Sequence, residues 1–471
     1  MAASRRRVFS LPVAAACLVV VLLRCLSASG EPLPQYYNAI FSFGDSFSDT
    51  GNFVIINSGK LPNMPKFPPP YARCSNGRLV IDFLAEAFGL PLLPPSANKG
   101  TNFSQGANFA VMGATALDLK YFKDNNVWSI PPFNTSMNVQ LQWFDEVKQT
   151  ICSDPAECRA FFSKSLFVFG EFGGNDYSFA WKAEWSLEKV KTMVPAVVAS
   201  LVRGVERLLD EGARHVVVPG NLPAGCIPIT LTMYPSEDRS EYDPRTGCLK
   251  RYNSVALYHN AMLRIALDRL QRRRPEARVV YADYYTPYIQ FARTPHLYEA
   301  GGGGSEVLGG VGHAAGGVPA DGAGQVRRRG GERDGDGVRP PDGVPAAAQR
   351  PGAVPQLDAA GGRGEHARQV PGRQARLRRL LPPGGAARPA AQQVRVQRGA
   401  SPCDRACCGG GGPYNYNPEA ACGSPGATVC GDPSAYVHWD GIHLTEAAYK
   451  YIANGWLNGL YAYPSILDLA N

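Results

Sequence analysis

In the stretch "AIFSFGDSFSDTGN" (Ala39–Asn52), a run of small and apolar residues leads directly into a polar turn. Ala39–Phe43 predicts a buried strand. Gly44 allows the chain to leave that strand sharply, and Ser46 lies two residues further on. Ser46 is therefore either one turn hydroxyl among several or a nucleophile held at the end of a strand.

Strand-like runs alternate with helical patterns along the rest of the chain. Further strands are predicted within "SLFVFGEFGGND" (165–176), "HVVVPGNLP" (215–223) and "ARVVYAD" (277–283). Helices are predicted at 78–89, 140–152, 187–212 (with Pro195 inside it), 250–274 and 444–460, the last with Thr445 as its N-cap. Such alternation indicates an α/β fold with a parallel sheet covered on both faces. In these sheets, sites form at the carboxyl ends of strands.

Residues 301–405 differ from the rest in composition. They contain no Phe, Tyr, Trp, Ile, Met, Asn, Thr or Lys, and they carry 16 Arg against 9 Asp and Glu, so that they hold +7 of the formal net charge of +8. Such a segment cannot bury enough apolar surface to offset chain entropy. The positive charge is therefore local, and it does not indicate a nucleic-acid partner.

A shifted reading frame offers a sharper explanation than a disordered, Arg-rich linker. If the codons are GC-rich, reading residues 342–356 one nucleotide later can give a sequence similar to "TGCLKRYNSVALYHN" (246–260). In the same way, residues 370–383 can give a sequence similar to the segment that ends at Pro287. We therefore expect 299–405 to be an out-of-frame or disordered insert, introduced when a paralogous gene was joined on. The predicted organisation is a signal peptide (1–30), one domain in two parts (31–298 and 406–471), and this insert.

The first 30 residues resemble a secretory signal peptide. Arg5–Arg7 precede an apolar run, Val8–Leu26, which Arg24 interrupts, and "SASG" follows. The alternative, a transmembrane anchor, is disfavoured because the run is short for a bilayer span. We expect a protein that is secreted or lies in the secretory pathway lumen, and that is not inserted in a membrane after cleavage.

Cysteines and sequons agree with that compartment. Cys152 and Cys158 are six apart and predict a small disulfide loop, whereas the pairings of other cysteines (Cys226, Cys248, Cys422 and Cys430 among them) do not follow from the sequence. Asn102 and Asn134 each begin a sequon and can accept a glycan.

Four short pieces could build an acyl-transfer site. Besides Ser46, "DGIH" places Asp440 and His443 three apart, so that one loop can carry a base and the carboxylate that orients it. Asn175 in "GGND" could aim its amide at an oxyanion, and Gly113 could offer a backbone N–H. Each piece alone also fits a turn, a helix start or simple packing.

The four pieces together resemble the GDSL lipase/esterase family, also called SGNH hydrolases, and its secreted plant branch. The matching blocks are "FGDSFSDTGN", "NFAVMGATAL", "GGND" and "DGIHLTEAAY", in that order. The resemblance implies a three-layer α/β/α sandwich with a mostly parallel central sheet, as in flavodoxin-like SGNH hydrolases. It implies Ser46 as nucleophile, His443 as general base and Asp440 as its orienting partner. Gly113, Asn175 and the Ser46 N–H would form the oxyanion hole, without metal or organic cofactor.

The expected reaction is hydrolysis of carboxylic esters through an acyl-serine, by a monomer acting on small-molecule or polysaccharide esters. Because no long apolar lid is visible, short acyl groups such as acetyl are favoured. Two alternatives stay open: an extracellular acyltransferase, and a non-catalytic secreted glycan-binding protein. A zinc cluster of Cys403, Cys407, Cys408 and His443 has poor ligand spacing and is disfavoured.

Overall fold

The computed structural model describes residues 36–58, 72–128, 134–294 and 404–469. The predicted signal peptide, 1–30, lies outside these residues. So does the predicted insert, 299–405, except for Asp404 and Arg405. No helix of the described ranges combines the length and the apolar character that a membrane span requires.

A parallel sheet forms the centre of the described part of the chain. Its strands stand in the order β2-β1-β3-β4-β5, and every neighbouring pair is parallel. Their bounds are β1 (Ile40–Phe43), β2 (Gly106–Asn108), β3 (Leu166–Phe169), β4 (His215–Pro219) and β5 (Arg278–Ala282). The strands predicted at 39–43 and within 165–176, 215–223 and 277–283 are thus present, whereas the short β2 was not predicted.

Alternate residues of each strand face two separate apolar cores. In β1, Phe41 and Phe43 join one core while Ile40 joins the other, and in β4 Val217 points away from the core that receives Val216. Period-two alternation with apolar residues on both faces is the pattern of a sheet covered on both sides.

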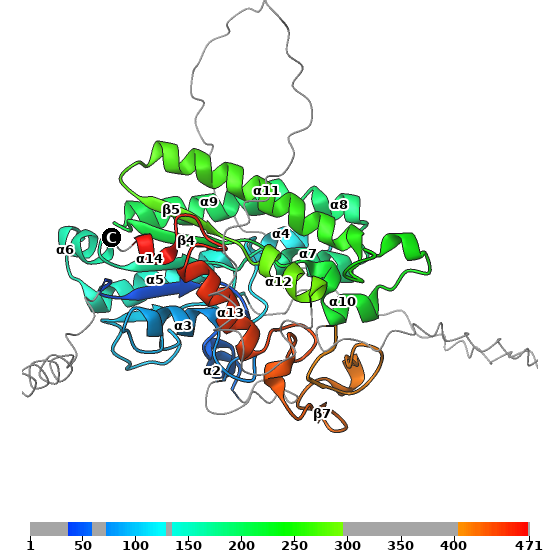
Figure 1. Ribbon diagram of the computed structural model, residues 1–471. Coiled ribbons are helices and arrows are strands. Elements are labelled where there is room, and N and C mark those ends of the chain that lie inside the picture. The colour runs from blue at the N-terminus through cyan, green and yellow to red at the C-terminus, as the bar shows by residue number, and fades with distance from the viewer. Residues whose placement is uncertain (1–35, 59–71, 129–133, 295–403, 470–471) are drawn as a thin grey trace, which may run out of the picture. The chain divides into compact units, whose positions relative to one another are not determined.

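Helices cover both faces, which confirms the three-layer α/β/α expectation. The core containing Phe41 receives side chains from α4 (Leu119–Asp124), α5 (Met137–Ile151), α6 (Pro155–Phe162), α7 (Gly174–Lys182), α8 (Leu187–Lys191), α9 (Val194–Asp210), α10 (Pro228–Met233) and α11 (Lys250–Arg273). The core containing Ile40 receives them from α3 (Val80–Ala87), α12 (Tyr285–Arg293), α13 (Glu446–Leu457) and α14 (Ile466–Leu469). Figure 1 shows α9 and α11 side by side, as their contacts require. Apart from short 3-10 helices, the described residues also form α2 (Asn52–Asn57) and a small antiparallel ribbon of β6 (Cys408–Gly409) and β7 (Thr428–Val429).

One helix expectation is wrong. The segment 187–212 is two helices, because α8 ends at Lys191 and α9 begins at Val194. Pro195 occupies the first turn of α9, where its missing N–H leaves no intrahelical bond unmade, and it cannot sit in a helix interior without removing such a bond. The N-cap prediction for Thr445 is confirmed, since its side chain accepts a hydrogen bond from the Ala448 N–H.

Disulfides connect several loops of the described part of the chain. The predicted Cys152–Cys158 bond is present, and the structure adds Cys226–Cys248, Cys407–Cys430 and Cys408–Cys422. The last two pairs hold the segment that precedes α13. The N–H groups of Cys407 and Cys408 donate to the carbonyls of His438 and Trp439, which ties this stapled segment to the loop carrying Asp440 and His443.

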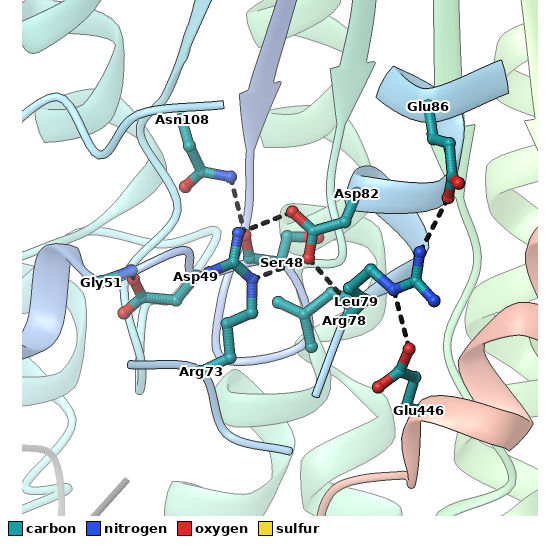
Figure 2. A network of polar contacts seen from close by, with 10 residues as sticks. All are labelled: Ser48, Asp49, Gly51, Arg73, Arg78, Leu79, Asp82, Glu86, Asn108 and Glu446. Atoms are coloured by element: carbon teal, nitrogen blue, oxygen red, sulfur yellow. Dashed lines mark hydrogen bonds and ion pairs between the residues drawn. The ribbon is translucent and has the colours of Figure 1, made fainter. Parts of the chain in front are cut away.

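A polar network ties the start of α3 to the start of α13 (Figure 2). Arg73 makes a bidentate, buried ion pair with Asp82 at 2.6 and 2.7 Å. Arg78 bridges Glu86 at 2.9 Å and Glu446 at 2.7 Å, and these side chains are partly exposed. Glu446 begins α13, three residues after His443, so the network fixes the loop before that helix.

The two arginines should differ in their effect on stability. Arg73→Met leaves the Asp82 carboxylate buried without its cation, and we expect the free energy of unfolding to fall by about 3–5 kcal/mol. Arg78→Met breaks solvent-screened pairs and should cost about 0–1 kcal/mol. Denaturant unfolding of both variants with the disulfides intact measures the difference. Equal losses for the two variants would contradict the assignment of the buried pair as the stronger support.

Candidate active site

Ser46 lies in the turn that leaves β1 at the carboxyl edge of the sheet, and it is 5% exposed. Gly44 makes this turn possible. Its φ is +142°, and a Cβ atom there would meet the Gly170 carbonyl oxygen at 2.7 Å. The Gln140 side chain holds the same glycine from the other side, because its oxygen accepts from the Gly44 N–H at 2.9 Å and its amide donates to the Gly44 carbonyl at 2.7 Å.

The structure brings Ser46, His443 and Asp440 together in one hydrogen-bonded chain. Ser46 Oγ lies 2.7 Å from His443 Nε2, and His443 Nδ1 lies 2.7 Å from Asp440 Oδ2. Ser46 and His443 are 397 positions apart in the sequence, so only the fold makes this contact. A hydroxyl, an imidazole and a carboxylate in this order can generate an alkoxide nucleophile.

Asp440 shapes the loop as well as facing the imidazole. Its Oδ1 accepts hydrogen bonds from the N–H groups of Ile442 at 2.9 Å and His443 at 2.8 Å, which leaves Oδ2 for the His443 ring. Burial alone would raise the pKa of Asp440, but the nearby His443 and these hydrogen bonds outweigh burial and lower it. The carboxyl group therefore stays ionised beside His443.

The two remaining residues of the predicted oxyanion hole, Gly113 and Asn175, lie in segments that are hydrogen-bonded to the Ser46 turn. The Val111 N–H donates to the Gly44 carbonyl at 3.1 Å, which brings the Gly113 loop alongside. Asn175, in the first turn of α7, donates from Nδ2 to Asp45 Oδ2 and to the Ala114 carbonyl, both at 3.0 Å. "GGND" was expected as a strand-end loop, but only Gly173 precedes the helix.

Two of the three expected oxyanion donors are unengaged. The N–H groups of Ser46 and Gly113 make no hydrogen bond to any described residue. Asn175 differs, because its two existing bonds take both amide hydrogens. Asn175 can bind an oxyanion only if it shares or releases one of them.

Several buried carboxyl groups surround the site and were not singled out from the sequence. Burial raises the pKa of Asp45 to about 7, and it raises that of Asp49 to about 6 although four backbone N–H groups donate to this side chain. Burial likewise raises the pKa of Asp176 to about 6, although the N–H groups of Ala116 and Leu117 bond its carboxylate. Asp49 and Asp176 bind backbone groups and so have a structural role. The sequence signal that could have found them is their place inside the matching blocks.

A cavity of about 490 Å³ opens beside Ser46. Its volume is typical of small-molecule sites. Most of its lining side chains are apolar, and they come from the Ser46 turn and from α7, α10, α11 and the segments leading to them: Phe47, Phe179, Trp181, Leu222, Ile227, Ile229, Met233 and Val255. Tyr416 and Pro418, from the disulfide-bonded segment 407–430, also line the cavity.

The two predicted glycan acceptors do not line this cavity, and two cysteines of the zinc alternative are bonded in disulfides. Asn102 and Asn134 are both exposed, as a glycan acceptor must be. Cys407 and Cys408 are each bonded in a disulfide, so they do not offer the thiolates that the zinc alternative needs.

Comparison with known proteins gives consistent matches. A family model described as "GDSL-like Lipase/Acylhydrolase" matches residues 40–335. The chain is 34% identical over 466 residues to the Arabidopsis thaliana protein "GDSL esterase/lipase At1g28580", with 96% of this chain and 94% of that protein covered. It is 33% identical over 442 residues to "GDSL esterase/lipase At5g45910" of the same plant, with 91% and 92% covered.

Among solved structures, an extracellular lipase from Streptomyces rimosus aligns with 54% of this chain and 82% of its own. The identity is 14% and the TM-score is 0.26, which is too low to inform the fold. The family resemblance read from the sequence is confirmed by the family model and by the plant relatives.

Proposed function

Since this chain belongs to the GDSL lipase/acylhydrolase family and is a carboxylic ester hydrolase, we propose that it works through an acyl-serine intermediate on Ser46. The observation that supports this mechanism is the contact of 2.7 Å between Ser46 Oγ and His443 Nε2. The nucleophile comes from the beginning of the chain and its base from the end, and Ser46 lines the cavity described above.

The proposed reaction has two halves. His443 Nε2 takes the Ser46 proton while Oγ attacks the ester carbonyl carbon, and the C–O bond to the alcohol then breaks. His443 returns the proton to the departing alcohol oxygen, which leaves an acyl-serine. Water then attacks the acyl carbon and gives a proton to His443. The bond from that carbon to Ser46 Oγ breaks, and His443 returns the proton to Oγ, which frees the acid and Ser46. Asp440 stabilises the imidazolium and holds the tautomer with Nε2 unprotonated in the resting state.

The oxyanion in both halves would be bound by the N–H groups of Ser46 and Gly113. Each such donor is worth roughly 3–4 kcal/mol of barrier. Asn175 would add a third donor when its bond to Asp45 or to Ala114 is shared with the substrate oxygen. Burial raises the pKa of Asp45, so this acceptor holds its negative charge less firmly than an exposed aspartate does.

The size of the acyl group that the cavity accepts does not follow from the mechanism. The absence of a long apolar lid favours acetyl, whereas the volume and apolar lining of the cavity favour a larger group. We propose that the cavity takes a medium-length acyl chain. Each buried methylene contributes about 0.8 kcal/mol, so several of them outweigh the loss of chain freedom.

A chain-length series tests this choice. We expect kcat/KM for p-nitrophenyl octanoate to exceed that for the acetate by about 10-fold or more. Ile227→Trp should fill part of the cavity and lower octanoate turnover about 10-fold, with acetate changed less than about threefold. Ile55→Trp, at an exposed position of α2, is the matched control and should change neither. Preference for acetate in the wild type would restore the short-acyl prediction.

We also propose that the protein is secreted. The four disulfides need an oxidising compartment such as the secretory pathway. The exposed sequons at Asn102 and Asn134 fit passage through it. Expression in plant cells with a C-terminal tag would test this, because the proposal expects the tag outside the cell on a glycosylated protein.

A further inference from the structure

Glu171 is a buried acid in the wall of the active-site cavity. It follows β3 by two residues, and its side chain is 2% exposed. It lines the same cavity as Ser46. The close approach of Gly44 to the Gly170–Glu171 peptide places its backbone against the Ser46 turn.

The carboxyl group of Glu171 is incompletely bonded. The Leu222 N–H donates to it, but Oε2 has no hydrogen-bond partner among the described residues. No cationic side chain of the described ranges contributes to its electrostatic environment. A buried polar atom without a partner is unfavourable, and such atoms call for a ligand or a functional explanation.

Neighbouring polar side chains of the cavity are already engaged. Asp45 accepts from the Phe47 N–H and from Asn175, and Asn221 donates to the Phe172 carbonyl at 2.8 Å. The Tyr177 hydroxyl lies 2.7 Å from a ring nitrogen of His259. The free oxygen of Glu171 therefore differs from the polar groups of these three neighbours, which are hydrogen-bonded.

Burial and the neighbouring Asp45 favour the protonated form of the Glu171 carboxyl group. Burial raises the pKa of this carboxyl well above its usual range, and the negative charge of Asp45 raises it further. A protonated carboxyl has one O–H donor and also accepts hydrogen bonds. It can thus bond an uncharged oxygen of a bound molecule, whereas it offers no charge to an ammonium group.

We propose that Glu171 is a specificity-determining residue that hydrogen-bonds an uncharged oxygen in the acyl group of the substrate. The preferred substrates are then esters whose acyl chain is mainly apolar but carries an ether, hydroxyl or carbonyl oxygen. A plain alkyl chain would leave the Glu171 group unpaired, and sites built to bond a substrate oxygen discriminate against analogues that lack it. This inference rests on the proposed acyl-serine hydrolysis.

An oxygen scan of the acyl chain tests the proposal. The substrates are p-nitrophenyl hexanoate and its analogues with one chain methylene, at position 3, 4 or 5, replaced by an ether oxygen. We expect the wild type to prefer one analogue over hexanoate by about 10-fold or more in kcat/KM. Glu171→Leu should abolish this preference, whereas Glu171→Gln keeps a donor and an acceptor in the same place and should retain it.

The ratio between substrates separates specificity from folding. Glu171→Leu also removes the acceptor of the Leu222 N–H, so its stability and its rate on every ester can fall. A structural role would lower all rates together and leave the ratio unchanged, and that result overturns the proposal. A wild type that prefers no ether analogue also overturns it. Failure of acyl-serine hydrolysis itself would look different, because Ser46→Ala would then hydrolyse hexanoate as fast as the wild type.

Discussion

Replacing Ser46 with Ala is expected to lower kcat by about 10⁶-fold on any ester that the wild type hydrolyses. The variant loses the Oγ atom that lies 2.7 Å from His443 Nε2, and no acyl-enzyme can form. The fold should be kept, because Ala is smaller and the Ser46 backbone is held through Gly44 and Gln140. Steady-state turnover of a p-nitrophenyl ester, with the thermal unfolding midpoint measured alongside, gives the result.

Ser48→Ala is the matched control for this change. Ser48 lies two residues from Ser46 and is buried to the same degree, and its Oγ makes one long bond of 3.4 Å to the Gly170 carbonyl. We expect its activity to stay within about threefold of the wild type. Residual activity of Ser46→Ala above one-hundredth of the wild-type rate would refute Ser46 as nucleophile.

Asp440→Asn should lower kcat by about 10⁴-fold although it changes only one atom of the side chain. The Asp440 Oδ1 atom accepts two backbone N–H groups, so in the variant the amide oxygen stays there. The amide NH₂ then faces His443 Nδ1 and makes that nitrogen an acceptor. The ring proton moves to Nε2, where it points at Ser46 and prevents the imidazole from taking the serine proton.

Asp432→Asn tests whether this loss is specific. Asp432 also accepts a backbone N–H, from Ser434 at 2.9 Å, but it is exposed and contacts no histidine. We expect its kcat to stay within about twofold of the wild type. A loss of less than about 10-fold for Asp440→Asn would contradict the role of Asp440 in setting the tautomer of His443.

Much of the sheet could be predicted, because strand periodicity is local information. "AIFSF" and "HVVVP" are apolar and β-branched or aromatic on both faces, and these segments are β1 and β4. The break before Pro195 was missed because the apolar pattern continues through it, although proline chemistry favours a helix start there. Strand β2, of three residues, is too short to show any period.

The residues of the active site could be predicted from the sequence, but the hydrogen bonds between them could not. Spacing suggested that Asp440 and His443 share a loop, and the family blocks pointed to Ser46, Gly113 and Asn175. The occupation of both Asn175 hydrogens depends on Asp45 and Ala114. These two hydrogen bonds join three segments that lie far apart in the sequence, so local sequence patterns could not predict them.

Apart from Cys152–Cys158, the disulfide pairs could not be predicted from the sequence, and neither could the buried carboxyl groups. Cys407 and Cys408 are adjacent, but Cys407 pairs with Cys430 and Cys408 pairs with Cys422. Which cysteines meet depends on the path of the chain between residues 408 and 430. Glu171 is an ordinary strand-end acid in the sequence. Its incomplete bonding follows from its burial beside Asp45, which exists only in the folded chain.

Reaction of the purified protein with a fluorophosphonate, followed by peptide mass spectrometry, tests whether Ser46 is the nucleophile. We expect one adduct, on Ser46, formed in step with the loss of esterase activity and strongly slowed by His443→Ala. Inactivation with the adduct on another residue, or full activity after Ser46 has been modified, would contradict it.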